Sequence, residues 1–305
     1  MAQIREIKKR MTAVSTIERI TKTMQMIATA KFTSSLQRAR ATRPYTDSIR
    51  ELVSRVAEAC GDELEDVLIN GADGAENREL ILVISSDRGL CGAYNSHVLR
   101  TASKHLNSLE ASGIDFELQI SGKKAGAFFN FAQIDVAERH QFGDKPSFEQ
   151  VAEVAEEMIK RFSAGEFSSV RVVYMRFESN ARQIPEVMQL LPMKFDAESV
   201  ADTDADVDAD GTADAATESG IVYDFSPSVD AILSELLPRA VKTSLFQAVN
   251  DAVVSEQVMR KIAMKAASDN AKGLGRTLKR DFNRARQGKI TTELTEIVSG
   301  AAALE

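Results

Sequence analysis

Tryptophan is absent from this 305-residue chain, and histidine and cysteine are scarce. Cys60 and Cys91 fall in different predicted elements without disulfide, metal or redox spacing, so we expect reduced thiols. His97 and His105 share a predicted helical face but lie about 12 Å apart along it, which is too far to hold one metal ion. For these two residues and for His140 we expect surface or half-buried positions.

The usual signatures of catalysis are also missing. The sequence has no H-E-x-x-H, C-x-x-C or G-x-S-x-G motif, and no carboxylate pair is framed by apolar residues as a tuned acid and base. No uncharged apolar run is long enough to predict a transmembrane helix, and the N-terminus lacks the apolar region of a signal peptide. We therefore expect a non-catalytic protein with no cofactor and with a mechanical or architectural function.

The net charge of -7 conceals a strong segregation of charge along the sequence. Residues 1–50 carry a net charge of +8, residues 239–296 carry +6, and the acidic residues are concentrated between them. Basic helices can bind nucleic acid or an acidic protein. The lack of tryptophan and the few aromatic residues in the basic segments give little support to base stacking, so an acidic protein partner fits as well.

The first 60 residues read as one helix that contains a single proline, Pro44. Ile4, Ile7, Met11 and Val14 are spaced as in a coiled coil. Ile17, Ile20, Met24 and Ile27 repeat the same spacing after 13 residues instead of 14. This pattern predicts a coiled-coil seam with one skip, which would change the supercoil locally.

A second long helical stripe runs from about Pro227 to the C-terminus. We expect the two stripes to form an antiparallel pair. Gly273, Gly275 and Gly288 each weaken a helix by about 1 kcal/mol relative to alanine, and Pro238 removes a hydrogen-bond donor. We therefore predict that the second helix bends near these residues.

Strand and helix patterns alternate in the middle of the chain. Residues 80–84, 116–121 and 170–175 read as strands, and residues 93–111 and 148–162 read as helices, with a further helix starting near Gly122. This order is typical of a mainly parallel sheet in a Rossmann-like α/β domain. The predicted fold class is thus α/β plus long helices, with the α/β domain between the two halves of a coiled coil.

The turn at residues 85–92, Ser-Ser-Asp-Arg-Gly-Leu-Cys-Gly, follows the first strand and invites a phosphate-binding interpretation. Gly89 and Gly92 complete neither a G-x-G-x-x-G motif nor a Walker loop. A tight turn with special backbone angles is the favoured interpretation.

Residues 196–218 are rich in Asp, Ala and Thr and contain no Lys or Arg. Asp202, Asp204, Asp206 and Asp208 have the spacing of a calcium loop, but the glycine and glutamate of such a loop are missing. We expect a disordered, solvated insertion. The predicted organisation is a coiled-coil helix over 1–60, the Rossmann-like domain over 78–195, the insertion over 196–220 and a second coiled-coil helix over 227–305.

The last sixteen residues predict a helix whose final turns are apolar or very small, from Ile297 to Leu304. A helix end of this kind gains little in water, whereas it fits a narrow socket in which bulk would clash and charge would be desolvated. The C-terminus therefore indicates enclosure by partner chains.

Four segments together resemble the gamma subunit of F-type ATP synthases. They are Ile290-Thr291-x-Glu293-x-x-Glu296-x-x-x-Gly300-Ala301, residues 20–28 (ITKTMQMIA), residues 86–92 (SDRGLCG) and residues 264–271 (MKAASDNA). They occur in order along essentially the whole chain.

The resemblance implies a central rotor shaft present once per complex. Its partners would be a ring of three alpha and three beta subunits around the coiled coil, with the epsilon subunit and the membrane-embedded c-ring at its foot. Proton flow would turn the shaft, and the catalytic beta subunits would respond in sequence. The resemblance implies no nucleic acid partner and a membrane association only through the complex, on the cytoplasmic face of a bacterial plasma membrane.

The resemblance also implies which residues contact the alpha/beta ring. The residues that it assigns are Lys22, Met24, Met26, Arg260, Lys261, Lys265, Arg286, Gln287, Thr291, Glu293, Glu296, Ile297, Gly300 and Ala301. The acidic insertion departs from the family pattern, and the paired cysteines of the chloroplast form are missing. Two alternatives remain open at this stage: an RNA-binding enzyme with a coiled-coil arm, and a generic coiled-coil scaffold.

Overall fold

The computed structural model of the chain describes residues 2–60, 66–72, 74–194 and 229–302. Two long helices, α1 (Ala2–Cys60) and α6 (Val229–Ala302), flank the other elements. The elements between them are α2 (Val67–Asn70), β1 (Arg78–Ile84), α3 (Tyr94–Ser112), β2 (Asp115–Ser121), α4 (Lys123–Phe131), β3 (Glu138–His140), α5 (Phe148–Ser163), β4 (Ser169–Phe177) and β5 (Gln183–Leu191). The predicted fold class is confirmed, whereas the acidic insertion lies outside the described residues.

The chain divides into two compact units. The helix-pair unit comprises Met1–Ser34, Gly89–Ala93 and Glu256–Glu305, and the sheet unit comprises Ser35–Arg88 and Tyr94–Ser255. Each unit contains a part of α1 and a part of α6.

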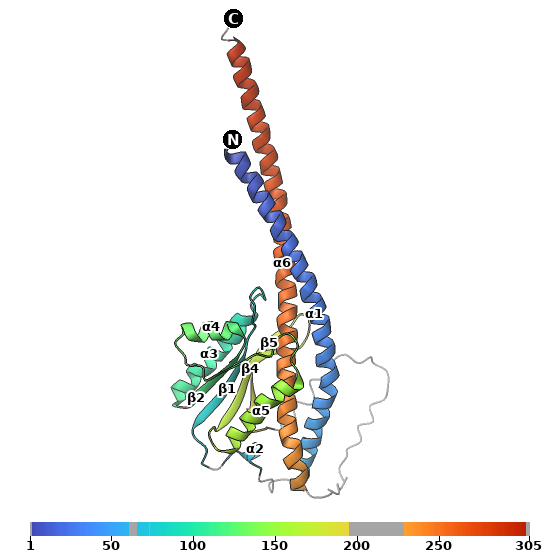
Figure 1. Ribbon diagram of the computed structural model, residues 1–305, viewed down its shortest axis with the longest axis vertical. Helices are drawn as coiled ribbons and strands as arrows, with labels where there is room; N and C mark the ends of the chain where they lie inside the picture. Colours follow the sequence, from blue (N-terminus) through green and yellow to red (C-terminus); the bar gives the residue numbers. More distant parts are fainter. Residues whose placement is uncertain (1, 61–65, 73, 195–228, 303–305) are drawn as a thin grey trace, which may run out of the picture. The chain divides into compact units, whose positions relative to one another are not determined.

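The sheet unit is built on five strands in the order β3-β2-β1-β4-β5. β1 pairs in parallel with β2 and β4, β2 pairs in parallel with β3, and β5 is antiparallel to β4. α3 and α5 lie on opposite faces of the sheet (Figure 1). Six of the seven residues of β1 are therefore buried, as its continuous apolar run predicts.

The main hydrophobic core of the sheet unit lies on the α5 face of the sheet. Leu80, Leu82 and Ile84 alternate along β1 and point into it. Val151, Ala155, Met158 and Phe162 face the same core from α5 at helical spacing, and Ser147 caps this helix by accepting a hydrogen bond from the Gln150 amide at 3.3 Å. The parts of α1 and α6 that belong to the sheet unit complete the core with Ile49, Val53, Leu233, Leu237, Val241 and Leu245.

The two long helices run antiparallel inside each unit. In the sheet unit, Thr42 Oγ1 donates to Gln247 Oε1 at 3.3 Å, and Arg50 donates to Ser244 Oγ at 3.3 Å. In the helix-pair unit, the Lys261 ammonium lies 4.4 Å from the centre of the Phe32 ring, and a Cβ atom on Gly275 would lie 3.9 Å from Val14 Cγ1. Residue numbers thus rise along α1 while they fall along α6.

α6 is one continuous helix from Val229 to Ala302. The bends expected near the proline and the glycines stay a prediction. Pro238 lies inside the helix, where it removes one backbone donor. Leu237 and Ala240 beside it are fully buried, and this packing holds the turn together. Gly273, Gly275 and Gly288 also lie inside the helix, and a local cost of about 1 kcal/mol at each is too small to break a helix that continues on both sides.

Glu79 and His140 are buried or half-buried ionisable groups of the sheet unit that have partners within it. Glu79 on β1 contacts His105 of α3 and accepts hydrogen bonds from Ser169 at 2.7 Å and Arg171 at 2.9 Å. Burial alone would raise the pKa of Glu79, but these hydrogen bonds and the charge of Arg171 hold it below its ordinary value. His140 lies 2.9 Å from Gln119, and burial lowers the pKa of its ring. These contacts give the two histidines structural positions.

Candidate partner-binding surface of the helix pair

The surface that partners would meet is formed by residues 2–34 of α1 and 256–302 of α6, which we call the helix pair. Buried or half-buried residues of α1 recur at alternating steps of three and four without a break: Ile4, Ile7, Met11, Val14, Glu18, Thr21, Gln25, Ala28 and Phe32. The predicted skip in the seam is therefore wrong. The helix keeps its seven-residue period and accepts polar residues into the seam.

The isoleucines that the skip prediction placed in the seam face outward instead. Ile17, Ile20 and Ile27 are each 51% exposed. The polar Thr21 that takes a seam position is buried, and its hydroxyl donates to the Ile17 carbonyl at 2.9 Å within the same helix. α1 therefore has a second apolar face, outside the seam.

The C-terminal part of α6 is exposed on its apolar side as well. We call Ile290, Leu294, Ile297 and Val298 the apolar C-terminal face; their exposed fractions run from 47% to 68%. Leaving four aliphatic side chains in water at successive turns of one helix is unfavourable. Together with the outer isoleucines of α1, this face indicates a surface that partner chains cover.

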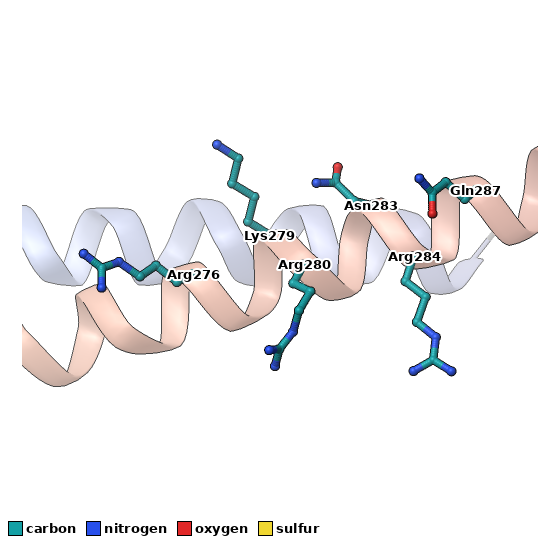
Figure 2. A pocket seen from close by; sticks show the side chains of 6 residues that line it. All are labelled: Arg276, Lys279, Arg280, Asn283, Arg284 and Gln287. Carbon is teal, nitrogen blue, oxygen red and sulfur yellow. The ribbon is translucent and has the colours of Figure 1, made fainter.

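A basic stripe precedes the apolar C-terminal face on α6. It is formed by Arg276, Lys279, Arg280 and Arg284, which line a shallow hollow with Asn283 and Gln287. Arg280 and Arg284 project to one side of the helix, whereas Lys279 projects to the other (Figure 2). Within the part of the chain that the structure describes, none of the four cations forms an ion pair. Their charge is therefore available to an acidic partner.

The sequence patterns did not lead us to predict the basic stripe as a binding site. Its signal was present in the net charge of +6 over residues 239–296. Charge counting alone did not show which of these cations are paired within the chain.

The predicted contact residues near the end of α6 are all exposed up to Ile297. Arg286, Gln287 and Glu296 lie on the helix surface. Thr291 Oγ1 donates to the Gln287 carbonyl of its own helix at 3.0 Å, and Glu293 accepts from Lys289 at 3.1 Å. Gly300 and Ala301 are helical. These residues are placed where partner contact is possible, and their roles stay a prediction.

The predicted contact residues on α1 differ in exposure. Lys22 is exposed and its ammonium lies 3.4 Å from Gln25 Oε1, whereas Met24 is half-buried at the edge of the seam. Met26 is exposed and lies near the outer isoleucines. Lys22 and Met26 are accessible to a partner, and Met24 packs partly within the helix pair.

The predicted basic band at residues 260–265 is less accessible than its sequence indicates. Arg260 is 8% exposed and forms an ion pair with Glu256 at 2.5 Å. Lys261 is engaged with Phe32, and only Lys265 is exposed. Arg260 is thus paired within α6 and Lys261 contacts α1, so these two cations are less available to a partner than the cations of the basic stripe.

The turn after β1 has the special backbone that the tight-turn interpretation requires. Leu90 and Gly92 have φ angles of 64° and 61°. The first amides of α4 are already occupied: Lys123 N donates to Asp87 Oδ1 at 3.2 Å, Lys124 N to the Ser86 carbonyl at 3.1 Å and Ala125 N to Ser85 Oγ at 2.9 Å. Ser85, Ser86 and Asp87 of the turn thus bind the N-terminus of α4, so these three α4 amides are not open to an anion.

Comparison with known proteins gives this surface its context. A family model described as ATP synthase matches residues 3–304. The ATP synthase gamma chain of Rhodopirellula baltica is 37% identical to the chain over 307 aligned positions, and the alignment covers the whole of both proteins. The chain belongs to the ATP synthase gamma chain family. A gamma chain from Leptospira biflexa is 33% identical, again over the full length of both proteins.

Solved structures agree with the gamma chain fold. A chain in the mitochondrial ATP synthase of Euglena gracilis, in an assembly described as OSCP/F1/c-ring, superposes with a TM-score of 0.67 at 22% identity. The superposition covers 99% of this chain and 95% of that one. A second structure, of the Euglena gracilis rotor, gives a TM-score of 0.62 and covers 95% of this chain and 99% of that one, also at 22% identity.

As a gamma chain, the protein is a non-catalytic subunit of the ATP synthase complex and forms the central stalk of F1. The family match does not support the RNA-binding enzyme or the generic scaffold. In the ranges that the structure describes, no helix has an apolar stretch long enough to span a membrane.

Proposed function

We propose that the helix pair is the rotating shaft of the complex, enclosed by a ring of three alpha and three beta subunits. The observation that carries this proposal is the exposed apolar C-terminal face of α6, reinforced by the outer isoleucines of α1. Such side chains stabilise an assembly when a partner covers them. An apolar bearing also has few hydrogen bonds to break as the shaft turns.

In this proposal the α/β domain of the gamma chain binds the epsilon subunit and the c-ring, and each complex contains one gamma chain. Proton flow turns the c-ring and the shaft with it. The shaft then drives the catalytic beta subunits in turn through binding, synthesis and release of ATP. The complex places the gamma chain on the cytoplasmic face of a bacterial plasma membrane, as a peripheral subunit.

The proposed ring contacts divide into two groups by chemistry. Apolar contact comes from Met24, Met26, Ile297, Gly300 and Ala301. Polar contact comes from Lys22, Arg260, Lys261, Lys265, Arg286, Gln287, Thr291, Glu293 and Glu296. To the polar group we add the basic stripe, because its four cations are exposed and unpaired within the described residues. An arginine can donate a forked pair of hydrogen bonds to a carboxylate on the facing subunit.

Co-purification tests the assembly directly. A tagged gamma chain, extracted gently from membranes, is expected to bring down alpha, beta and epsilon subunits with one gamma chain for every three beta subunits. Quantitative mass spectrometry gives the ratio. Recovery of the tagged chain alone as a homo-oligomer, or with RNA, would overturn the shaft proposal.

Neutralising the basic stripe tests the polar contacts. Replacing all four cations with glutamine is expected to weaken binding of the gamma chain to the alpha/beta ring by about tenfold at low salt, because an exposed ion pair contributes about 0.2–1 kcal/mol. The binding of the unmodified chain should weaken toward that of the variant as salt is added. Affinity at two salt concentrations is the measurement.

A matched control removes the same charge from the sheet unit. It replaces four exposed cations with glutamine: Arg100, Lys104, Lys123 and Lys124. This control is expected to retain the affinity of the unmodified chain. Equal losses in the two variants would show that net charge, and not the basic stripe, determines the affinity.

A further inference from the structure

A buried carboxylate lies at the junction of four elements in the sheet unit, where the shaft function assigns no chemistry. Asp251 on α6 is 6% exposed. Its electrostatic neighbours come from α1, β4 and β5, in addition to its own helix. An ionised carboxylate in such a place loses most of its hydration and needs compensation from the protein.

The contact that Asp251 makes is with a neutral amide. Gln247 Nε2, one turn earlier on α6, donates to Asp251 Oδ1 at 3.0 Å. The carbonyl end of the same amide accepts from Thr42 Oγ1 of α1 at 3.3 Å. Gln247 thus links the carboxyl of α6 to α1.

The charged groups around Asp251 do not neutralise it. Arg176 on β4 is within 3.2 Å of Glu186 on β5, and the Tyr174 hydroxyl donates to the same carboxylate at 3.4 Å. Glu186 therefore competes with Asp251 for the positive charge of Arg176, and its own negative charge repels an ionised Asp251.

Two arginines of α1 complete these surroundings. Arg43 has a favourable electrostatic interaction with Asp251 but forms no ion pair with it within the described ranges. Arg50 donates to Ser244 on α6, one turn before Gln247. The junction therefore holds Asp251 without a bonded cation.

Burial raises the pKa of Asp251 to about 7, although Arg43, the Gln247 hydrogen bond and Arg176 act in the opposite direction. The same surroundings raise the pKa of Tyr174, because burial and the negative charges of Glu186 and Asp251 disfavour a phenolate. The burial of Asp251 and the lack of a bonded cation among the described residues favour a neutral carboxyl over an ionised one.

We propose that protonation of Asp251 controls how tightly α6 packs against α1 and the β4–β5 hairpin within the sheet unit. In the protonated form the carboxyl is neutral and needs no cation. In the ionised form the buried charge must draw in water, which loosens the packing of α6 around Asp251, or attract the exposed Arg43. This inference concerns the folded chain itself and does not depend on the shaft proposal.

The direction of the pH effect follows from proton binding. An unfolded aspartate has a pKa near 3.8, whereas that of Asp251 in the folded chain is about 7. Between these values the folded chain holds a proton that the unfolded chain lacks. The stability that this proton contributes is fully present below the lower value and is lost as pH rises through the upper one.

The test compares the full-length chain with Asp251→Asn between pH 5 and pH 8. For the unmodified chain, the unfolding equilibrium constant should rise relative to that of the variant by about tenfold per pH unit at the lower end of this window and level off above pH 7. Denaturant unfolding gives the constant, and hydrogen exchange of the α6 amides around Asp251 locates the change. The three histidines are common to both chains, so their titration cancels.

Asp281→Asn is the matched control, since Asp281 is exposed on the same helix. It should retain the pH dependence of the unmodified chain. If Asp251→Asn does not fold, the Asp251 carboxyl is followed directly by carbon-13 NMR in the unmodified chain. A titration midpoint near that of an ordinary aspartate, or an Asp251→Asn variant with an unchanged pH dependence, would overturn the proposal.

Discussion

Replacing Gly122 with alanine is expected to destabilise the sheet unit by about 3–5 kcal/mol, a large part of the stability of a typical domain. Gly122 joins β2 to α4 and has a φ angle of 93°, a value that residues other than glycine rarely adopt. A Cβ atom there would lie 2.2 Å from the Ser85 carbonyl oxygen. The clash is with backbone, so no side-chain rotation relieves it.

The surroundings of Gly122 cannot move aside cheaply. The Ser85 amide donates to the Ser121 carbonyl at 2.8 Å, and Ser85 Oγ accepts from the Ala125 amide at 2.9 Å. A shift of Ser85 would break hydrogen bonds that join the ends of β1 and β2 to α4. Buried hydrogen-bond donors left without an acceptor would lower the stability of the sheet unit further.

Denaturant unfolding followed by circular dichroism measures this effect. Gly113→Ala and Gly143→Ala are the controls, because both glycines have positive φ angles but open space around the added Cβ atom. We expect these controls to lose about 1–2 kcal/mol, the cost of the left-handed backbone alone. A Gly122→Ala chain no less stable than the controls would show that the strand–helix junction is not rigid.

Deleting residues 290–305 is expected to reduce proton-driven ATP synthesis severely and to weaken assembly of the complex. The deletion removes the apolar C-terminal face, for which burial of the exposed surface would contribute about 1–2 kcal/mol per side chain. The side chains of this face are largely exposed in the chain alone, so their loss should leave the sheet unit intact. Synthesis in energised vesicles and recovery of the intact complex are the measurements.

A second variant of full length separates apolar contact from helix length. Leu294→Asp with Ile297→Asp retains every residue but places two charges on the apolar C-terminal face. If that face is enclosed by the ring, this variant should fail in the same way as the deletion, since charge would be desolvated. Unchanged proton-driven synthesis in the deleted complex would contradict the proposal that these residues hold the shaft in the ring.

The prediction of a skip in the seam was wrong because hydrophobicity alone does not determine which residues of α1 pack against α6. Ile17, Ile20 and Ile27 are more apolar than Glu18, Thr21 and Gln25, so hydrophobicity alone favoured them as seam residues. A helix cannot change its period for one segment without a change in winding, and the residues before and after keep the regular period. The polar residues therefore enter the seam, and the isoleucines remain outside for a partner.

The strand β5 was not predicted, whereas β1, β2 and β4 were. β1 has a continuous apolar run that marks burial on both faces. β5 contains Pro185 and is mostly half-buried, so its pattern is weak. Its pairing with β4 makes the sheet mixed, and this pairing depends on contacts between strands that no local pattern records.

Local patterns by themselves determined the two long helices, the α/β order between them and the apolar C-terminus, because helical and strand periodicity are properties of neighbouring residues. The four motifs placed the chain in its family. Only the tertiary structure decided which cations are paired, since Arg260 and Arg280 look alike in sequence but one has a carboxylate partner and the other has none among the described residues. It also showed that Asp251 is buried without a bonded cation, because burial and electrostatic surroundings arise only when distant segments are brought together.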